Sequence, residues 1–506
     1  MKKIKKILIP ILEWKAVHLD STRYDSDIFY ASLARELANG MKIAFGSENG
    51  VSDKTLALTA IDLAAYLQDK VDGLNMWNSF IALYRKEYGR EFPFYNVEGE
   101  EILNDEPNLS DIRFLLWRGL NRNSETTIVN PSNPFIAALA ERVFETLCDA
   151  YEQAPETPEL RELLFTPEVY EDPILMRNLC GYIGSKAYLT RIHNVESVLE
   201  TASGLLDTLD FSSLSDPQKA YFIEAYISLN LSVGPMNLPP YIWLAQILEL
   251  SGSKAMKHFA ENLRNIKSYT IMPCVIKEVS ENSFTVLNPA NETMEVSFTN
   301  ILPENRSDAK VGHGFIASLY FYNGYWQING ISTFTEKPID YTADIENYAE
   351  AMRNREATFK HYDKLLNGNR IGTAPDYDSL LKTLGIENIK PSSGQDIAKN
   401  LKSQKNFVYF LNSDGQITIL PDAAQLIKLP DNNLYDVAKA TALSAQMFLI
   451  PSMTAEMRQY IFTHNLMPDA RLAGPTPDEE AKAWFRNNCM FLAADLFSDK
   501  VLFNMP

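Results

Sequence analysis

Residues 315–329 read FIASLYFYNGYWQIN, and apolar and polar side chains alternate on both sides of Asn323-Gly324. An Asn-Gly pair between two alternating runs is the strongest short-range signal for a two-residue β-hairpin, because both central residues of that turn need a positive φ. The stretch therefore predicts a hairpin in which Phe321 faces Trp326 and Ser318 faces Asn329.

The two faces of this hairpin differ in character. One face is apolar and is expected to be a core, formed by Phe315, Ala317, Leu319, Phe321, Trp326 and Ile328. The other is amphipathic, and tyrosine offers a large contact area with a polar hydroxyl at interfaces. We interpret this second face as a contact surface for a partner protein, formed by Tyr320, Tyr322, Tyr325, Gln327 and Asn329. The alternative is that a neighbouring helical domain covers it.

Three further strands are expected upstream, at residues 269–279, 283–288 and 293–298, with turn-like sequence and no helix between them. Five short strands in succession favour a small antiparallel β-barrel of SH3-like or OB-like size.

The segments on either side of this β region are mainly helical. Between residues 24 and 265, apolar residues recur at spacings of three and four, as on the buried face of a helix. Ser52 or Asp53 can cap one such helix, which Gly73 ends. Another begins with Asn133 as N-cap and Pro134 at the first helical position.

The last third of the chain mixes helices with a second hairpin at residues 407–420, after a loop at residues 372–393 around a short helix. The predicted fold class is therefore α+β, mainly α. We expect a large helical domain over residues 1–266, a small antiparallel β-barrel over 267–336 and an α+β domain over 337–506.

Charge disfavours a nucleic-acid function. The 506-residue chain has a formal net charge of −18, and phosphate binding needs a local basic patch. Residues 268–335 do not supply one, because their acidic side chains outnumber the basic ones. Single-stranded nucleic-acid binding by stacking of bases on the barrel tyrosines is kept as a second alternative.

Cysteine usage and hydropathy favour a cytoplasmic protein with no membrane span. The four cysteines are scattered and form no C-x-x-C pair, which argues against a disulfide framework or a zinc site. Four lysines before residues 7–12 resemble the start of a signal peptide, but a proline, Glu13 and Lys15 interrupt the apolar run.

No cofactor and no metal site is predicted. Residues 312–317 match G-x-G-x-x-A by letters, but a strand follows where a dinucleotide site needs a helix. The six histidines lie in none of the recurring ligand spacings.

Two short stretches are candidate sites. Arg118 and Arg122, at a helix end, could clamp an anionic ligand, although arginines there often only complement the helix dipole. His464 and Asp469 follow another helix and could form an acid–base pair, although a solvated charged turn is the simpler interpretation.

Two pairs of segments carry a family resemblance: Trp117-Arg118-Gly119 leading to Asn133-Pro134-Phe135, and residues 429–435 leading to 465–470. Together they resemble a family of uncharacterised bacterial proteins catalogued as a domain of unknown function, which implies no activity. The leading prediction is thus a non-enzymatic binding or scaffold protein with a protein partner. The alternative is a hydrolase using His464 and Asp469, with Arg118 or Arg122 as anion holder.

Overall fold

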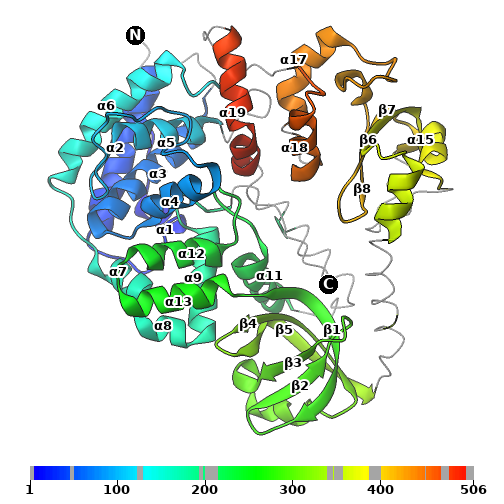
Figure 1. Ribbon diagram of the computed structural model, residues 1–506. Coiled ribbons are helices and arrows are strands. Elements are labelled where there is room, and N and C mark those ends of the chain that lie inside the picture. The colour runs from blue at the N-terminus through cyan, green and yellow to red at the C-terminus, as the bar shows by residue number, and fades with distance from the viewer. Residues whose placement is uncertain are drawn as a thin grey trace. The chain divides into compact units, whose positions relative to one another are not determined.

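A computed structural model of the chain describes residues 5–45, 51–121, 129–192, 198–199, 215–338, 346, 357–386, 401–448, 450, 452–468 and 478–496. The chain divides into two compact units (Figure 1), Met1–Tyr341 with Ala494–Pro506 and Thr342–Ala493. The first unit holds both the predicted helical domain and the predicted β region. The predicted class, α+β and mainly α, is confirmed.

The described helices of the first unit form its larger part (Figure 1). They are α1 (Ile11–Ala16), α2 (Asp27–Phe45), α3 (Asp53–Asp72), α4 (Met76–Tyr88), α5 (Leu109–Asn121), α6 (Pro134–Tyr151), α7 (Pro158–Phe165), α8 (Pro167–Glu171), α9 (Pro173–Ser185), α11 (Asp216–Asn230), α12 (Pro240–Leu250) and α13 (Lys254–Arg264). The predicted caps are confirmed. Ser52 accepts from the Thr55 amide, Gly73 ends α3 in the left-handed conformation, and Asn133 caps α6.

Helix α3 is the centre of this helical part, because α2, α4, α5, α6 and α7 all contact it. Its apolar residues are buried as the spacing predicts, and so are charged and amide side chains on the same helix: Asp62, Gln68, Asp69, Lys70 and Asp72. A buried polar group is costly unless it is hydrogen-bonded or paired. The neighbouring helices and loops therefore have to supply its partners.

Five strands follow in the first unit: β1 (Ser268–Val279), β2 (Ser283–Leu287), β3 (Thr293–Ser297), β4 (His313–Tyr322) and β5 (Tyr325–Pro338). They pair in the order β1-β2-β3-β5-β4, and β4 pairs with β1, so the order closes on itself. Between β3 and β5 the pairing is parallel and consists of Val296 with Trp326. Of the apolar face predicted for the hairpin, Phe315, Ala317, Leu319 and Ile328 belong to the core of these strands and Trp326 packs against it. Phe321 is outside that core, is half-buried and packs edge-on against Trp326.

The Asn323-Gly324 hairpin is confirmed, with φ of 52° and 86° at the two turn residues. Phe321 pairs with Trp326 as expected. The predicted pairing of Ser318 with Asn329 is wrong, because the register shifts between Ala317 and Leu319. The extra residues of β5 include Gly330, whose φ is 90° and which lies against Ala225 of α11, so the irregularity fits the strand to that helix.

The amphipathic face of the hairpin is mostly covered by helices of the same unit. The hydroxyls of Tyr320 and Tyr322 donate to the carbonyls of Pro173 (2.8 Å) and Tyr170 (2.7 Å). Asn329 donates to the carbonyl of Ala225 (2.9 Å).

The predicted partner surface is therefore wrong for Tyr320, Tyr322, Gln327 and Asn329, which are buried, and only Tyr325 is exposed. The physical reason is that the hydroxyls of Tyr320 and Tyr322 and the amide of Asn329 donate to backbone carbonyls of α9, α8 and α11. This face joins the sheet to the helices.

The second unit contains a three-stranded antiparallel sheet in the order β6-β7-β8. Its elements are β6 (Ile371–Asp376), α15 (Tyr377–Leu384), β7 (Lys405–Leu411), β8 (Ile417–Leu420), α17 (Val437–Phe448), α18 (Ala455–Thr463) and α19 (Asp478–Leu496), whose last residues belong to the first unit. The second hairpin, β7 with β8, is confirmed. Strand β6 occupies sequence predicted to be a loop, because β7 supplies its pairing partner. None of the described helices combines the length and the apolar composition that a membrane crossing requires.

We expect Tyr322→Ala to lower the free energy of unfolding of the first unit by about 3–5 kcal/mol, because it leaves a cavity where a buried aromatic side chain stood. Tyr325→Ala, on the same face but 44% exposed, is the matched control and is expected to change it by about 0.5 kcal/mol or less. Urea unfolding followed by tryptophan fluorescence measures both. An equal loss of unfolding free energy in the two variants would contradict the burial of Tyr322 beneath the helices.

Candidate functional site

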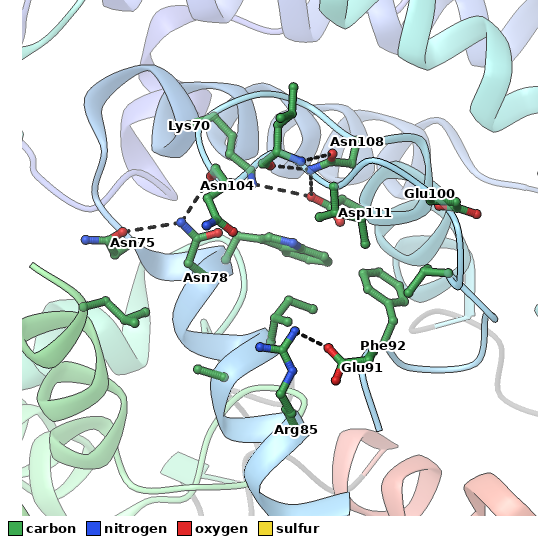
Figure 2. Close-up of a pocket in the computed structure, with 17 residues that line it drawn as sticks. Lys70, Asn75, Asn78, Arg85, Glu91, Phe92, Glu100, Asn104, Asn108 and Asp111 are labelled. Atoms are coloured by element: carbon green, nitrogen blue, oxygen red, sulfur yellow. Dashed lines mark hydrogen bonds and ion pairs between the residues drawn. The ribbon is translucent and has the colours of Figure 1, made fainter. Parts of the chain in front are cut away.

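A cavity of about 760 Å³ opens between α4, the start of α5 and the segment of residues 91–104 (Figure 2). Its walls are partly apolar, from Ile81, Ala82, Ile102, Leu103 and Leu250. Volumes of this size are those of small-molecule sites.

The floor of the cavity carries a buried ion pair from two helices. Lys70, in the last turn of α3, places Nζ 3.6 Å from Oδ2 of Asp111, in the first turn of α5. The two side chains are 2% and 1% exposed. Lys70 also donates to the backbone carbonyl of Asn104 (2.9 Å), so the pair has the added hydrogen bonds that a desolvated pair needs (Figure 2).

Asp111 is held by two further groups. Its Oδ2 accepts from the Tyr66 hydroxyl (2.6 Å) and from Nδ2 of Asn108 (3.1 Å). Burial raises the pKa of the Asp111 carboxyl, and the nearby Lys70 ammonium opposes that rise. Its Oδ1 has no hydrogen bond of regular geometry in the described structure, and the Trp77 side chain also opposes the rise of the Asp111 pKa. The floor is thus an ion pair whose two members are held in place by further hydrogen bonds.

Above this floor, uncharged amides line the cavity from two sides. Nδ2 of Asn78, on α4, donates to the carbonyl of Asn104 (3.2 Å) and weakly to Oδ1 of Asn75 (3.4 Å) (Figure 2). The Asn104 side chain is exposed, and it makes no hydrogen bond within the described residues. Asn104 therefore offers both donors and the acceptor of its side chain to a ligand, whereas Asn78 offers its acceptor oxygen.

The mouth of the cavity is spanned by a second ion pair. Nη2 of Arg85 lies 2.6 Å from Glu91, and the side chains are 54% and 67% exposed (Figure 2). Exposed pairs of this kind contribute little to stability. The pair can therefore open at low cost.

Asp69 of α3 fixes the helix that forms one wall. Its carboxylate accepts from the amides of Met76 (3.0 Å) and Trp77 (2.7 Å) at the start of α4, and from the Tyr188 hydroxyl (2.9 Å). Burial raises the pKa of Asp69, and the two amides oppose that rise. A carboxylate at a helix N-terminus is favourable, so Asp69 sets the position of Asn78 indirectly.

Asp72 faces a different neighbour. Its Oδ1 accepts from the Thr157 amide (2.7 Å), while Oδ2 is buried without a hydrogen bond in the described structure. Burial raises the pKa of Asp72 to about 6.

Neither Arg118 nor His464, two of the site residues predicted from the sequence, lines this cavity. Arg118 is buried, pairs with Asp495 of the same unit (2.6 Å) and donates to the Leu189 carbonyl (2.8 Å), so its role is structural. Arg122 and Asp469 lie outside the described residues. His464 is exposed and its ring stacks on Tyr460.

Tyr66, Lys70 and Asp111 were not predicted from the sequence. One signal could have found the first two: α3 has apolar residues on all sides, and such a helix is buried together with its charges. Within the described residues no group of three or more His, Cys, Asp or Glu side chains could hold a metal ion.

The family model described as Protein of unknown function (DUF3843) matches residues 8–203 and 325–497. The chain belongs to this family. The predicted resemblance to a family without established activity is confirmed. The DUF3843 match includes the whole cavity floor and α4, whereas β1–β4 lie outside it. No curated protein and no solved structure matches the chain.

We expect Asp72→Asn to raise the thermal unfolding midpoint at pH 7 by a few degrees. A carboxyl with a raised pKa binds its proton more tightly in the folded state, so its contribution to stability falls as pH rises from about 4 to about 6. Asparagine keeps the acceptor for Thr157 and carries no charge.

The gain should disappear below about pH 4, where Asp72 is protonated in both states. Melting curves of both proteins at a series of pH values measure it. If the midpoints of the two proteins differed by the same amount at pH 4 and at pH 7, the raised pKa of Asp72 would be contradicted.

Proposed function

We propose that this DUF3843 protein is a binding protein for a small, neutral, polar molecule, and that the cavity above Lys70 and Asp111 is its site. The observation that carries the proposal is that four of the five charged side chains in the lining are paired within the protein, Lys70 with Asp111 and Arg85 with Glu91. The Asn104 side chain, by contrast, makes no hydrogen bond within the described residues. The fifth charged side chain, Glu100, is exposed, where a charge attracts a counter-ion only weakly. A charged ligand that used either pair would have to break it, whereas a hydroxyl or amide group would not.

The site has features of a pre-formed pocket. Its apolar walls can cover the carbon skeleton of a ligand while Asn78 and Asn104 orient its polar groups. Asp69 and the buried ion pair hold the two sides without a ligand. Little ordering entropy is therefore lost on binding.

A catalytic role is the second candidate. A carboxyl whose pKa is raised by burial, beside an ammonium and a phenol, is an arrangement found in acid–base sites. The Lys70 ammonium and the Tyr66 hydroxyl both interact with Oδ2 of Asp111, so the three groups already serve as partners for one another. This favours a structural role for these three residues and a binding function for the cavity. The hydrolase proposed for His464 and Asp469 keeps no support from the described geometry.

Other features of the proposal come from the sequence. We propose that the five strands are a small barrel of SH3-like or OB-like size, supported by their closed order. A cytoplasmic location is supported by Cys180, Cys274 and Cys489, which are buried free thiols. A scaffold role would have to use surfaces other than the covered tyrosine face, and that covering also leaves single-stranded nucleic acid without the predicted stacking platform.

A thermal-shift screen with neutral mono- and disaccharides, nucleosides and blocked dipeptides tests the proposal. We expect at least one compound to raise the midpoint, because a ligand that binds only the folded state stabilises it. Asn104→Ala should weaken that ligand about fivefold or more through loss of a hydrogen bond. Ala82→Phe should abolish binding by filling the cavity.

Asn369→Ala, at an exposed asparagine of the second unit, is the matched control and should bind as the unaltered protein does. Because the Asn104 side chain makes no hydrogen bond within the described residues, its loss should not impair folding. Binding that is unchanged in both Asn104→Ala and Ala82→Phe would refute this site.

A further inference from the structure

A second cavity, of about 270 Å³, is lined by other residues of the 91–104 segment. Glu100 lines both cavities, and the start of α5 contributes to both: Asp111 to the first, Leu109 and Ser110 to the second. The second cavity also contains Arg113, one turn further along α5.

Arg113 is a half-buried cation that has no counter-ion among the described residues. Its guanidinium lies 4.2 Å from the centroid of the Tyr95 ring, and Nη2 makes one long hydrogen bond to the Pro131 carbonyl (3.4 Å). Its Nε is buried without a partner, and no ion pair to Arg113 occurs in the part of the chain that is described. Guanidinium groups bind carboxylates and phosphates through two parallel hydrogen bonds, and the stacked ring fixes this one in orientation.

Ser110 supplies a second, independent sign of a missing ligand. Its side chain is 5% exposed and lines the cavity, and its Oγ has no hydrogen-bond partner in the described structure. Buried hydroxyls are nearly always satisfied. Ser110 also belongs to the first turn of a 13-residue helix, where the amides have no intrahelical partner and the dipole favours negative charge.

The backbone beside the cavity is strained. Phe94, which lines it, has a φ of 67°, a conformation that bulky side chains rarely adopt. Its ring packs on Trp117, with centroids 4.6 Å apart, and this contact holds the residue in place. Strain of this kind is concentrated at functional sites.

We propose that this second cavity binds a small anion, a carboxylate or a phosphoryl group, through Arg113, Ser110 and the start of α5. Two exposed carboxylates, Glu100 and Glu141, also line the cavity and limit the charge that it accepts. The site is therefore suited to a small anion of low charge. It is distinct from the amide-lined cavity and does not depend on the ligand proposed there.

Isothermal titration of the full chain with inorganic phosphate and, separately, with acetate at constant ionic strength tests the proposal. We expect saturable binding of at least one anion, and the tighter of the two identifies the group. Arg113→Gln should weaken it about tenfold or more, since hydrogen bonds to charged groups are strong. The affinity of Arg113→Lys for the anion should lie between those of the unaltered protein and Arg113→Gln. Ser110→Ala should weaken anion binding by a smaller factor than Arg113→Gln.

Arg306→Gln is the matched control. Arg306 is also half-buried, also lies by an aromatic ring (Phe298, 5.6 Å) and also donates to carbonyls, but its Nε has a partner and it does not line the cavity. Its loss should leave anion binding unchanged. Circular dichroism melting confirms that each variant is folded. Failure of the unaltered protein to bind either anion, or equal binding by folded Arg113→Gln, would overturn the proposal.

Discussion

The burial of α3 with its charges is the constraint on which the first unit depends. Beyond its exposed start at Asp53, α3 is enclosed by five other helices, so its buried carboxylates are kept from water and require partners from particular neighbours. Lys70 has Asp111 on α5, Asp69 has the first amides of α4, and Asp62 has Arg191 at 2.9 Å. Each pairing joins α3 to one particular neighbour. Such directional pairs select one packing arrangement more specifically than apolar contacts alone would.

The same constraint places the two cavities. The last turn of α3 anchors the start of α4 through Asp69 and the start of α5 through Lys70, and the 91–104 segment passes over both helix ends. Polar groups that α3 does not satisfy then face the two cavities: the Asn104 amide in the larger, and a guanidinium and a hydroxyl in the smaller. The two proposed sites, one for a neutral polar molecule and one for an anion, thus share the 91–104 segment in their linings.

Local signals in the sequence predicted much of this fold, and non-local pairing accounts for what they missed. Ser52, Gly73 and the Asn323-Gly324 turn act within a few residues of themselves, so their effects can be predicted without the rest of the chain. The alternation that predicted Tyr320 opposite the core could not show what covers it, because its hydroxyl partner, Pro173, is 147 residues away. Asp111 carried no motif at all, since its role depends on a lysine in another helix.

The most direct test of this account is a double-mutant cycle on Lys70→Met and Asp111→Asn, followed by urea unfolding at neutral pH. The account predicts that each single change lowers the free energy of unfolding by about 3–5 kcal/mol, because the other charge is left buried and unpaired, and that the double variant recovers much of the loss. The exposed pair in the same cavity, Arg85→Met with Glu91→Gln, should show a coupling of about 0–1 kcal/mol. Additive losses at Lys70 and Asp111, with no coupling beyond that of the exposed pair, would contradict the claim that paired charges on α3 organise the structure.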